Sequence, residues 1–252
     1  MSFYASLRKE VLELVRTHRL LVMAVILIAF GLASPLLAKL LPEMMGLVPG
    51  GEDFLSLIPT PTISDAIAQY VKNLSLFGVL VAYLMTMGAV ATEKERGTAV
   101  LMLVKPLPRA VFLLTKFVAL ALAFLGCLAL AGLGGYYYTM LLFSAPDLSA
   151  WVVLNLMLWL YFLVYVALIL LASTIAKSQA VAAGLGIGAI AVLGALPSIP
   201  GLGRYLPGQL ITWGTALFTD PSARSWPALG ISLGLIAACL VAAWIILDRQ
   251  EL

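Results

Sequence analysis

The residues best placed to act together lie in one charged segment, residues 92–116, which has the sequence TEKERGTAVLMLVKPLPRAVFLLTK and separates two apolar runs. Thr92 and Glu95 have the spacing of a capping box, in which a hydroxyl and a carboxylate satisfy the free N–H groups of a new helix. Pro106 and Pro108 lack an N–H and clash with the preceding turn, so they end that helix. The segment therefore predicts a short surface helix that can dock a cytosolic partner, with an ordinary solvated loop as the alternative.

The rest of the chain lacks the side chains that catalysis or metal binding would require. His18 is the single histidine, and with no cysteine or acidic cluster near it we expect an interfacial residue rather than a base or a ligand. Cys127 and Cys239 lie in apolar runs and are expected to be small buried side chains. With one histidine and no paired carboxylates in an expected span, hydrolytic catalysis by this chain is not expected. The sequence contains no G-x-x-x-x-G-K-[ST] motif, so ATP binding by this chain is not expected either.

Ion-coupled transport would need an ionisable group deep in a span, where such groups are costly and usually functional. All 12 acidic residues fall in expected loops or at the termini. Lys116 lies one or two turns into an apolar run and is expected to snorkel back to the membrane surface. A secondary carrier is therefore disfavoured. No basic patch suggests nucleic-acid binding.

The elements that position this segment must be membrane helices. The chain has 252 residues, of which 63% are hydrophobic and only 11% charged, and its mean hydropathy is +1.08. Soluble domains contain about a quarter charged residues, so this composition indicates an integral membrane protein. We expect one all-α transmembrane domain over residues 1–252, with six spans of about 20 residues each. The expected spans are 20–41, 71–91, 110–132, 151–176, 180–196 and 228–247.

Three further features are predicted around these spans. Residues 2–19 place apolar and basic side chains on opposite helix faces, which favours an amphipathic helix in the interface plane over a solvated one. The third span is expected to break at Gly134 and Gly135, before three tyrosines typical of an aromatic belt. Residues 208–218 are apolar but too short to cross the bilayer, which predicts a re-entrant segment before the last span.

The fifth span is short and rich in glycine, including Gly184, Gly186 and Gly188. Small residues let helix backbones approach closely in membranes. The span is therefore expected to form either a seam between two protomers or a mobile helix that lines a pathway.

The distribution of positive charge predicts the orientation. If the N-terminus is inside, eleven of the 15 Lys and Arg residues fall on the cytoplasmic side: Arg8, Lys9, Arg16, Arg19, Lys94, Arg96, Lys105, Arg109, Lys116, Lys177 and Arg249. The positive-inside rule then places both termini and the loop 92–109 in the cytoplasm of a multi-pass protein of the cell membrane.

The charged segment resembles the ABC-2 type transporter permeases. Its pattern E-x-E-x-G-T, a hydrophobic stretch, P-x-x-R and a later Lys falls on these residues: Glu93, Glu95, Gly97, Thr98, Pro106, Arg109 and Lys116. The resemblance implies that this segment, with Arg96, couples the permease to a separate ATPase subunit that carries the ATP and magnesium. We expect Glu93, Glu95 and Arg96 to be exposed, so that reversing Glu93 would leave folding nearly unchanged.

The resemblance also implies two permease protomers, here expected as a homodimer in the lipid bilayer, with the second and fifth spans lining a path for export. Apolar spans suit a lipid, a drug or a hydrophobic peptide alike. The alternative is a non-transporting membrane scaffold or assembly factor that docks a cytosolic partner through the same segment.

Overall fold

The computed structural model describes residues 3–46, 60–97 and 108–250, and within these ranges it contains helices and no strand. The helices, in chain order, are α1 (Phe3–Arg16), α2 (Arg19–Gly46), α4 (Ile63–Thr86), α5 (Ala91–Glu95), α7 (Arg109–Leu142), α8 (Leu148–Ile175), α9 (Gln179–Ala195), α10 (Gly208–Ala216) and α11 (Trp226–Arg249). Two 3₁₀ turns, Leu196–Ser198 and Gly203–Tyr205, lie between α9 and α10. Among the described residues, six helices are long and apolar enough to cross a membrane. The all-α fold with six spans is thus confirmed.

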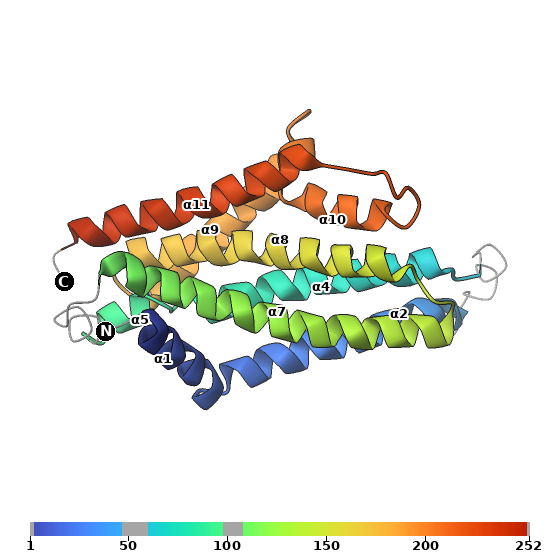
Figure 1. The fold of residues 1–252 in the computed structure, drawn as a ribbon, viewed down its shortest axis with the longest axis horizontal. Coiled ribbons are helices and arrows are strands. Elements are labelled where there is room, and N and C mark those ends of the chain that lie inside the picture. Colours follow the sequence, from blue (N-terminus) through green and yellow to red (C-terminus); the bar gives the residue numbers. More distant parts are fainter. Residues whose placement is uncertain (1–2, 47–59, 98–107, 251–252) are drawn as a thin grey trace.

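The long helices run roughly side by side in one bundle (Figure 1). The start of α1, the end of α11 and the short helix α5 lie at one end, which we call the terminal end, and the opposite end is the far end. Helix α8 packs against α4, α7, α9, α10 and α11, and 56% of its most apolar window is buried against 17% for α9 and α11. Helix α8 is therefore the centre of the bundle, whereas α9 and α11 keep most of their surface free.

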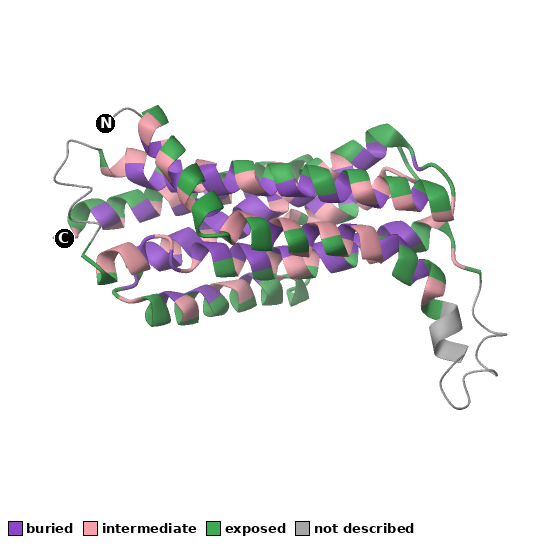
Figure 2. Cartoon of the chain, turned by 90° about the horizontal axis from the view of Figure 1, so that it is seen from below, coloured by how far each residue is buried: buried purple, intermediate pink, exposed green. Residues whose placement is uncertain are grey.

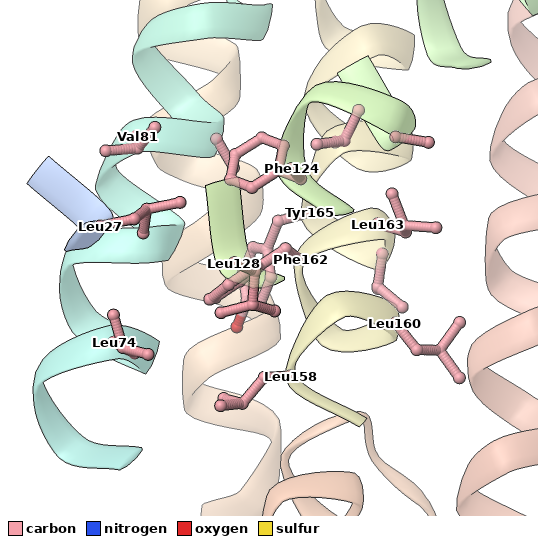
Figure 3. Packing of buried hydrophobic residues seen from close by; sticks show 14 of the residues in the cluster. Leu27, Leu74, Val81, Phe124, Leu128, Leu158, Leu160, Phe162, Leu163 and Tyr165 are labelled. Carbon is pink, nitrogen blue, oxygen red and sulfur yellow. The ribbon is translucent and has the colours of Figure 1, made fainter. Parts of the chain in front are cut away.

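Buried residues lie mostly on the inward faces of the helices and exposed residues on the outside (Figure 2). Many of the exposed residues are large and apolar. Phe162 of α8 lies in the middle of the core, with its ring centroid 5.6 Å from that of Phe124 on α7 (Figure 3). Gly78 of α4 faces Phe162 so closely that a Cβ there would lie 2.2 Å from the ring. Such small residues allow helices to approach in a membrane, where the hydrophobic effect does not drive helices together.

Polar side chains join the helices inside the bundle. Tyr70 of α4 donates its hydroxyl to the Asn155 side chain on α8 at 2.7 Å. Asn73 donates to Ser34 of α2 at 2.9 Å, and the Trp151 ring N–H donates to the Gly132 carbonyl at 3.0 Å. Hydrogen bonds of this kind fix which helix faces meet, since their groups would otherwise be buried without partners.

Two span boundaries differ from the sequence prediction. Helix α7 runs without interruption through Gly134 and Gly135 to Leu142, so the expected break is wrong. A Cβ at Gly135 would lie 2.6 Å from the Tyr70 ring and one at Gly134 would lie 2.6 Å from Leu32. These glycines therefore serve close packing rather than helix termination.

The second span begins earlier than predicted, at Ile63 instead of residue 71. Thr62 and Asp65 form a capping box there, with the Thr62 N–H and hydroxyl each 2.7 Å from the Asp65 carboxylate. The early start places Lys72 more than two turns inside α4 rather than at its edge.

Helices α1 and α10 lie within the predicted segments 2–19 and 208–218 and are somewhat shorter than them. Helix α1 exposes Phe3, Tyr4 and Val15 and buries Ser6 and Glu10 on a face packed against α7. His18 forms the corner into α2 with a left-handed backbone (φ 57°). Helix α10 packs on α8. The interfacial position of α1 and the re-entrant path of α10 stay predictions.

Two glycines with opposite surroundings test the packing. Gly78→Ala is expected to destabilise the protein, because the buried Phe162 ring must move to admit a methyl group. Gly126→Ala, on a face of α7 with nothing within 4 Å, should be neutral or stabilising by up to about 1 kcal/mol from helix propensity. Thermal unfolding in detergent would measure both. Equal melting temperatures for the two variants would contradict this packing of α4 on α8.

Candidate functional site

Helix α5 begins one residue before Thr92, and its free N–H groups are satisfied from another helix. Ser173 of α8 accepts hydrogen bonds from the N–H groups of Val90 and Ala91, both at 3.1 Å. Thr92 is therefore not the cap, and the predicted capping box with Glu95 is wrong. A buried serine 83 residues away along the chain supplies the acceptor instead.

The side chains of Thr92 and Glu95 connect α5 to the start of α9. The Gln179 N–H donates to the Glu95 carboxylate at 3.0 Å, and the Thr92 hydroxyl donates to the Gln179 side-chain oxygen at 3.3 Å. A carboxylate at a helix N-terminus is favourable because the first N–H groups have no partner within the helix. Glu95, although exposed, thus holds α9 beside α5.

Lys94 points the other way, to the end of α8. Its ammonium donates to the carbonyls of Thr174 and Ala176, which the last turn of α8 leaves without intrahelical partners. A cation at a helix C-terminus is stabilised by the helix dipole. Helix α5 therefore contacts the C-terminus of one spanning helix and the N-terminus of the next.

Glu93 belongs to a buried group of charges that we call the lysine–glutamate cluster: Lys9, Glu10 and Glu13 of α1, Glu93 of α5 and Lys116 of α7. The Lys116 ammonium lies 2.8 Å from Glu93 and 3.1 Å from Glu10. Only 4% of the Lys116 side chain and 15% of the Glu93 side chain are exposed. Two predictions are therefore wrong: Lys116 does not snorkel to water, and Glu93 is not a surface charge.

Lys9 is the second lysine of the cluster and pairs with all three of its carboxylates. Its ammonium lies 3.1 Å from Glu10 and 3.5 Å from both Glu13 and Glu93. Burial lowers the pKa of Lys9, but the neighbouring carboxylates of Glu10 and Glu93 outweigh that effect and raise the pKa above its ordinary value. Glu10, Glu13 and Glu93 place carboxylate oxygens within 4.8 Å of one another. The ammonium groups of Lys9 and Lys116 lie among these three carboxylates and offset two of the three negative charges.

Arg109 ties α7 to the end of α11. Its guanidinium donates to the carbonyls of Leu247, Asp248 and Gln250, the latter two at 2.8 and 3.1 Å. These carbonyls belong to the last turn of α11, where a cation is favourable. Arg109 is thus a structural tie at the terminal end rather than a freely exposed side chain.

Glu95, Arg96 and Gly97 are the described coupling residues that stay exposed, and of these Glu95 bonds α9. Gly97 has a left-handed backbone (φ 68°), its N–H donates to the Lys94 carbonyl at 3.0 Å, and no atom would contact an added Cβ within 4 Å. Glycine is the residue favoured in this conformation at a helix end. Thr98 and Pro106 lie outside the described residues.

A cavity of about 640 Å³ opens between α1, α4, α5 and α7 at the terminal end, lined by the cluster and by Arg96 and Gln179. The candidate site is therefore the helix α5 together with the ion pairs and hydrogen bonds that join its charged side chains to the neighbouring helices, rather than an isolated charged loop.

The three glycines of α9 have different surroundings. Gly186 is buried, and a Cβ there would lie 3.1 Å from the Tyr83 ring of α4, whose hydroxyl donates to the Ala183 carbonyl at 3.1 Å. Gly184 and Gly188 are exposed with nothing within 4 Å. Gly186 therefore serves packing within the chain, and only the other two lie on a surface free for a second protomer.

Sequence reasoning missed Ser173, Gln179 and the role of Glu10. Glu10 stands between Ser6 and Leu14 at helical spacing, so a carboxylate on the inward stripe of α1 was the available signal. Nothing local marks Ser173 or Gln179 as partners of α5. Their role depends on how α8 and α9 pack.

Removing one partner of a buried ion pair leaves the other charge without compensation, which costs about 3–5 kcal/mol. Lys116→Met is therefore expected to lower the melting temperature strongly. Lys177→Met, at an exposed lysine of the same end, is the control and should change little. The exchanged pair Lys116→Glu with Glu93→Lys should recover part of the loss. Equal stability of the Lys116→Met and Lys177→Met variants would contradict the buried cluster.

Comparison with known proteins agrees with this architecture. The family described as ABC-2 family transporter protein matches residues 4–252. The chain is also 29% identical over 214 residues to the uncharacterized transmembrane protein YxlG of Bacillus subtilis (strain 168), which covers 82% of this chain and 81% of that protein. Since the family match extends over nearly the whole length, this chain belongs to the ABC-2 transporter family of multi-pass membrane proteins.

Proposed function

We propose that this chain is the permease subunit of an ATP-driven exporter of the cell membrane, coupled to a separate ATPase subunit through α5 and the residues that follow it. The observation that carries the proposal is the attachment of α5 to four other helices. Ser173 of α8 accepts hydrogen bonds from the backbone at the start of α5. The charged side chains of α5 form ion pairs or hydrogen bonds with α1, α7 and α9. A force applied at α5 is therefore delivered directly to the spanning helices.

The free end of α5 is the docking point in this proposal. Arg96 and Gly97 are exposed, and the absence of a Cβ at Gly97 lets another backbone approach closely. The positive-inside rule supports a cytoplasmic position for this end, and with it for both termini. ATP and magnesium would be bound by the ATPase, since this chain has no phosphate-binding loop.

The proposal also includes a second permease protomer. Helix α9 buries only 17% of its most apolar window and exposes Gly184 and Gly188. Small exposed residues on a spanning helix favour close contact with another helix. A homodimer with this face at or near the protomer seam would enclose a pathway that a single bundle does not. In that arrangement, alternating access would follow from rocking of the two bundles.

Arg96→Glu tests the coupling, because it reverses an exposed charge without disturbing the buried cluster. Reversal of a charge at a desolvated interface is expected to weaken ATPase binding by about tenfold or more. Insertion and melting temperature should be unchanged, since exposed substitutions shift stability by about 0.5 kcal/mol or less. Co-purification of the ATPase and ATP-dependent transport would be measured.

Arg249→Glu reverses an exposed charge at the same end, on α11 rather than beside α5, and is the control that should keep ATPase binding. A complementary reversal on the ATPase should restore the Arg96→Glu complex. Full ATPase binding by Arg96→Glu would contradict coupling at α5. A stable ATPase complex without any solute-dependent ATP hydrolysis would favour the scaffold alternative.

A further inference from the structure

A second cleft lies at the far end, between α4 and α10, and differs in chemistry from the charged cavity at the terminal end. Its volume is about 360 Å³, within the usual range for small-molecule pockets. Its polar lining consists of one lysine and four hydroxyls: Ser64, Lys72, Thr212, Thr215 and Thr219. Apolar side chains, including Phe218, complete the walls.

Lys72 lies well inside the span. The neighbouring Asn73 bonds Ser34 of α2, and Lys39, five residues further along α2, donates to the carbonyl of Leu142 at the end of α7. At about 1.5 Å per residue, Lys72 therefore lies about 7–8 Å deeper than Lys39. A cation at such a depth is costly unless something neutralises it.

The described residues do not supply that neutralising group. The Lys72 side chain is exposed, and no ion pair or side-chain hydrogen bond is found for it among the described residues. Among the described residues, the hydroxyls of Ser64 and Thr212 have no hydrogen-bond partner, while those of Thr215 and Thr219 donate to the carbonyls of Thr212 and Ala216 in α10. The cleft thus presents an ammonium and two hydroxyl donors, and none of the described residues that line it carries a carboxylate.

We propose that this cleft binds the anionic head group of an amphiphile, with a phosphate or carboxylate on Lys72 and an apolar tail along the walls beside Phe218. Charge complementarity selects the head group, because a charge-assisted hydrogen bond is the strong interaction available there. The walls and the surrounding bilayer select a molecule with a tail over a free anion. That the bound molecule is transported rests on the proposed function, whereas binding itself does not.

Binding can be measured without the ATPase, using fluorescent phosphatidylglycerol and the protein in phosphatidylcholine nanodiscs. Lys72→Gln is expected to weaken binding by about tenfold or more, and Lys72→Arg should retain it. Thr212→Val, which removes one hydroxyl, should weaken it by a smaller factor. Lys39→Gln removes the same charge from the same end outside the cleft and should bind as the unmodified protein does.

Equal binding by Lys72→Gln and Lys39→Gln would overturn the proposal and show that Lys72 only snorkels to the membrane surface. Displacement of the probe by inorganic phosphate at similar concentration would overturn the assignment of an amphiphile, because the tail would then contribute nothing. Loss of binding in Lys72→Gln without any ATP-dependent movement of the probe in the intact complex would support the site and count against transport of this class. Failure of the proposed function is detected separately, by ATPase binding to Arg96→Glu.

Discussion

Lys116 lies inside the helix bundle, where its ammonium has almost no contact with water and is stabilised by the carboxylates of Glu10 and Glu93. A buried charge of this kind tolerates little displacement of its partners, because separation leaves a desolvated ion without compensation. Its two partners come from α1 and α5, which are not adjacent in sequence. The position of each of these helices on α7 therefore depends on the other.

This constraint explains why a five-residue helix has a defined place. Helices of that length are not stable by themselves, since nucleation is unfavourable and few hydrogen bonds form. Ser173 accepts hydrogen bonds from backbone N–H groups at the N-terminus of α5, and the charged side chains of α5 contact α1, α7, α8 and α9. After its C-terminus the chain turns at a glycine with a left-handed backbone. In the proposed function, the exposed end receives the ATPase and the buried charges pass the displacement to α1 and α7.

The sequence was sufficient for the overall architecture, because hydropathy over about 20 residues identifies spanning helices almost independently of their neighbours. The sequence was a poorer guide to the roles of glycines and capping residues, because those roles depend on tertiary contacts. Gly134 and Gly135 look like helix breakers but lie where Leu32 and Tyr70 approach α7. Thr92 looks like a cap, yet the cap is Ser173, and no local pattern marks that serine.

The environment of charged residues was also difficult to predict from the sequence. A lysine in a span and a glutamate in a loop suggest separate solvated groups. Only the structure shows that they contact each other and that Glu10 of α1 joins them in a cluster. Conversely, Lys72 looks like an edge residue until the capping box at Thr62 moves the helix start outward. The family pattern pointed to the segment that contains α5, but it did not distinguish the residues that hold α5 from those that remain exposed.

The central claim is that Lys116 holds α1 and α5 together on α7. Hydrogen–deuterium exchange of backbone amides, compared between the unmodified protein and Lys116→Met under conditions where both remain folded, tests it most directly. The account predicts faster exchange in both α1 and α5 of the variant, with α11 unchanged because Arg109 holds it independently. Unchanged protection of α1 and α5 in the variant would contradict the account.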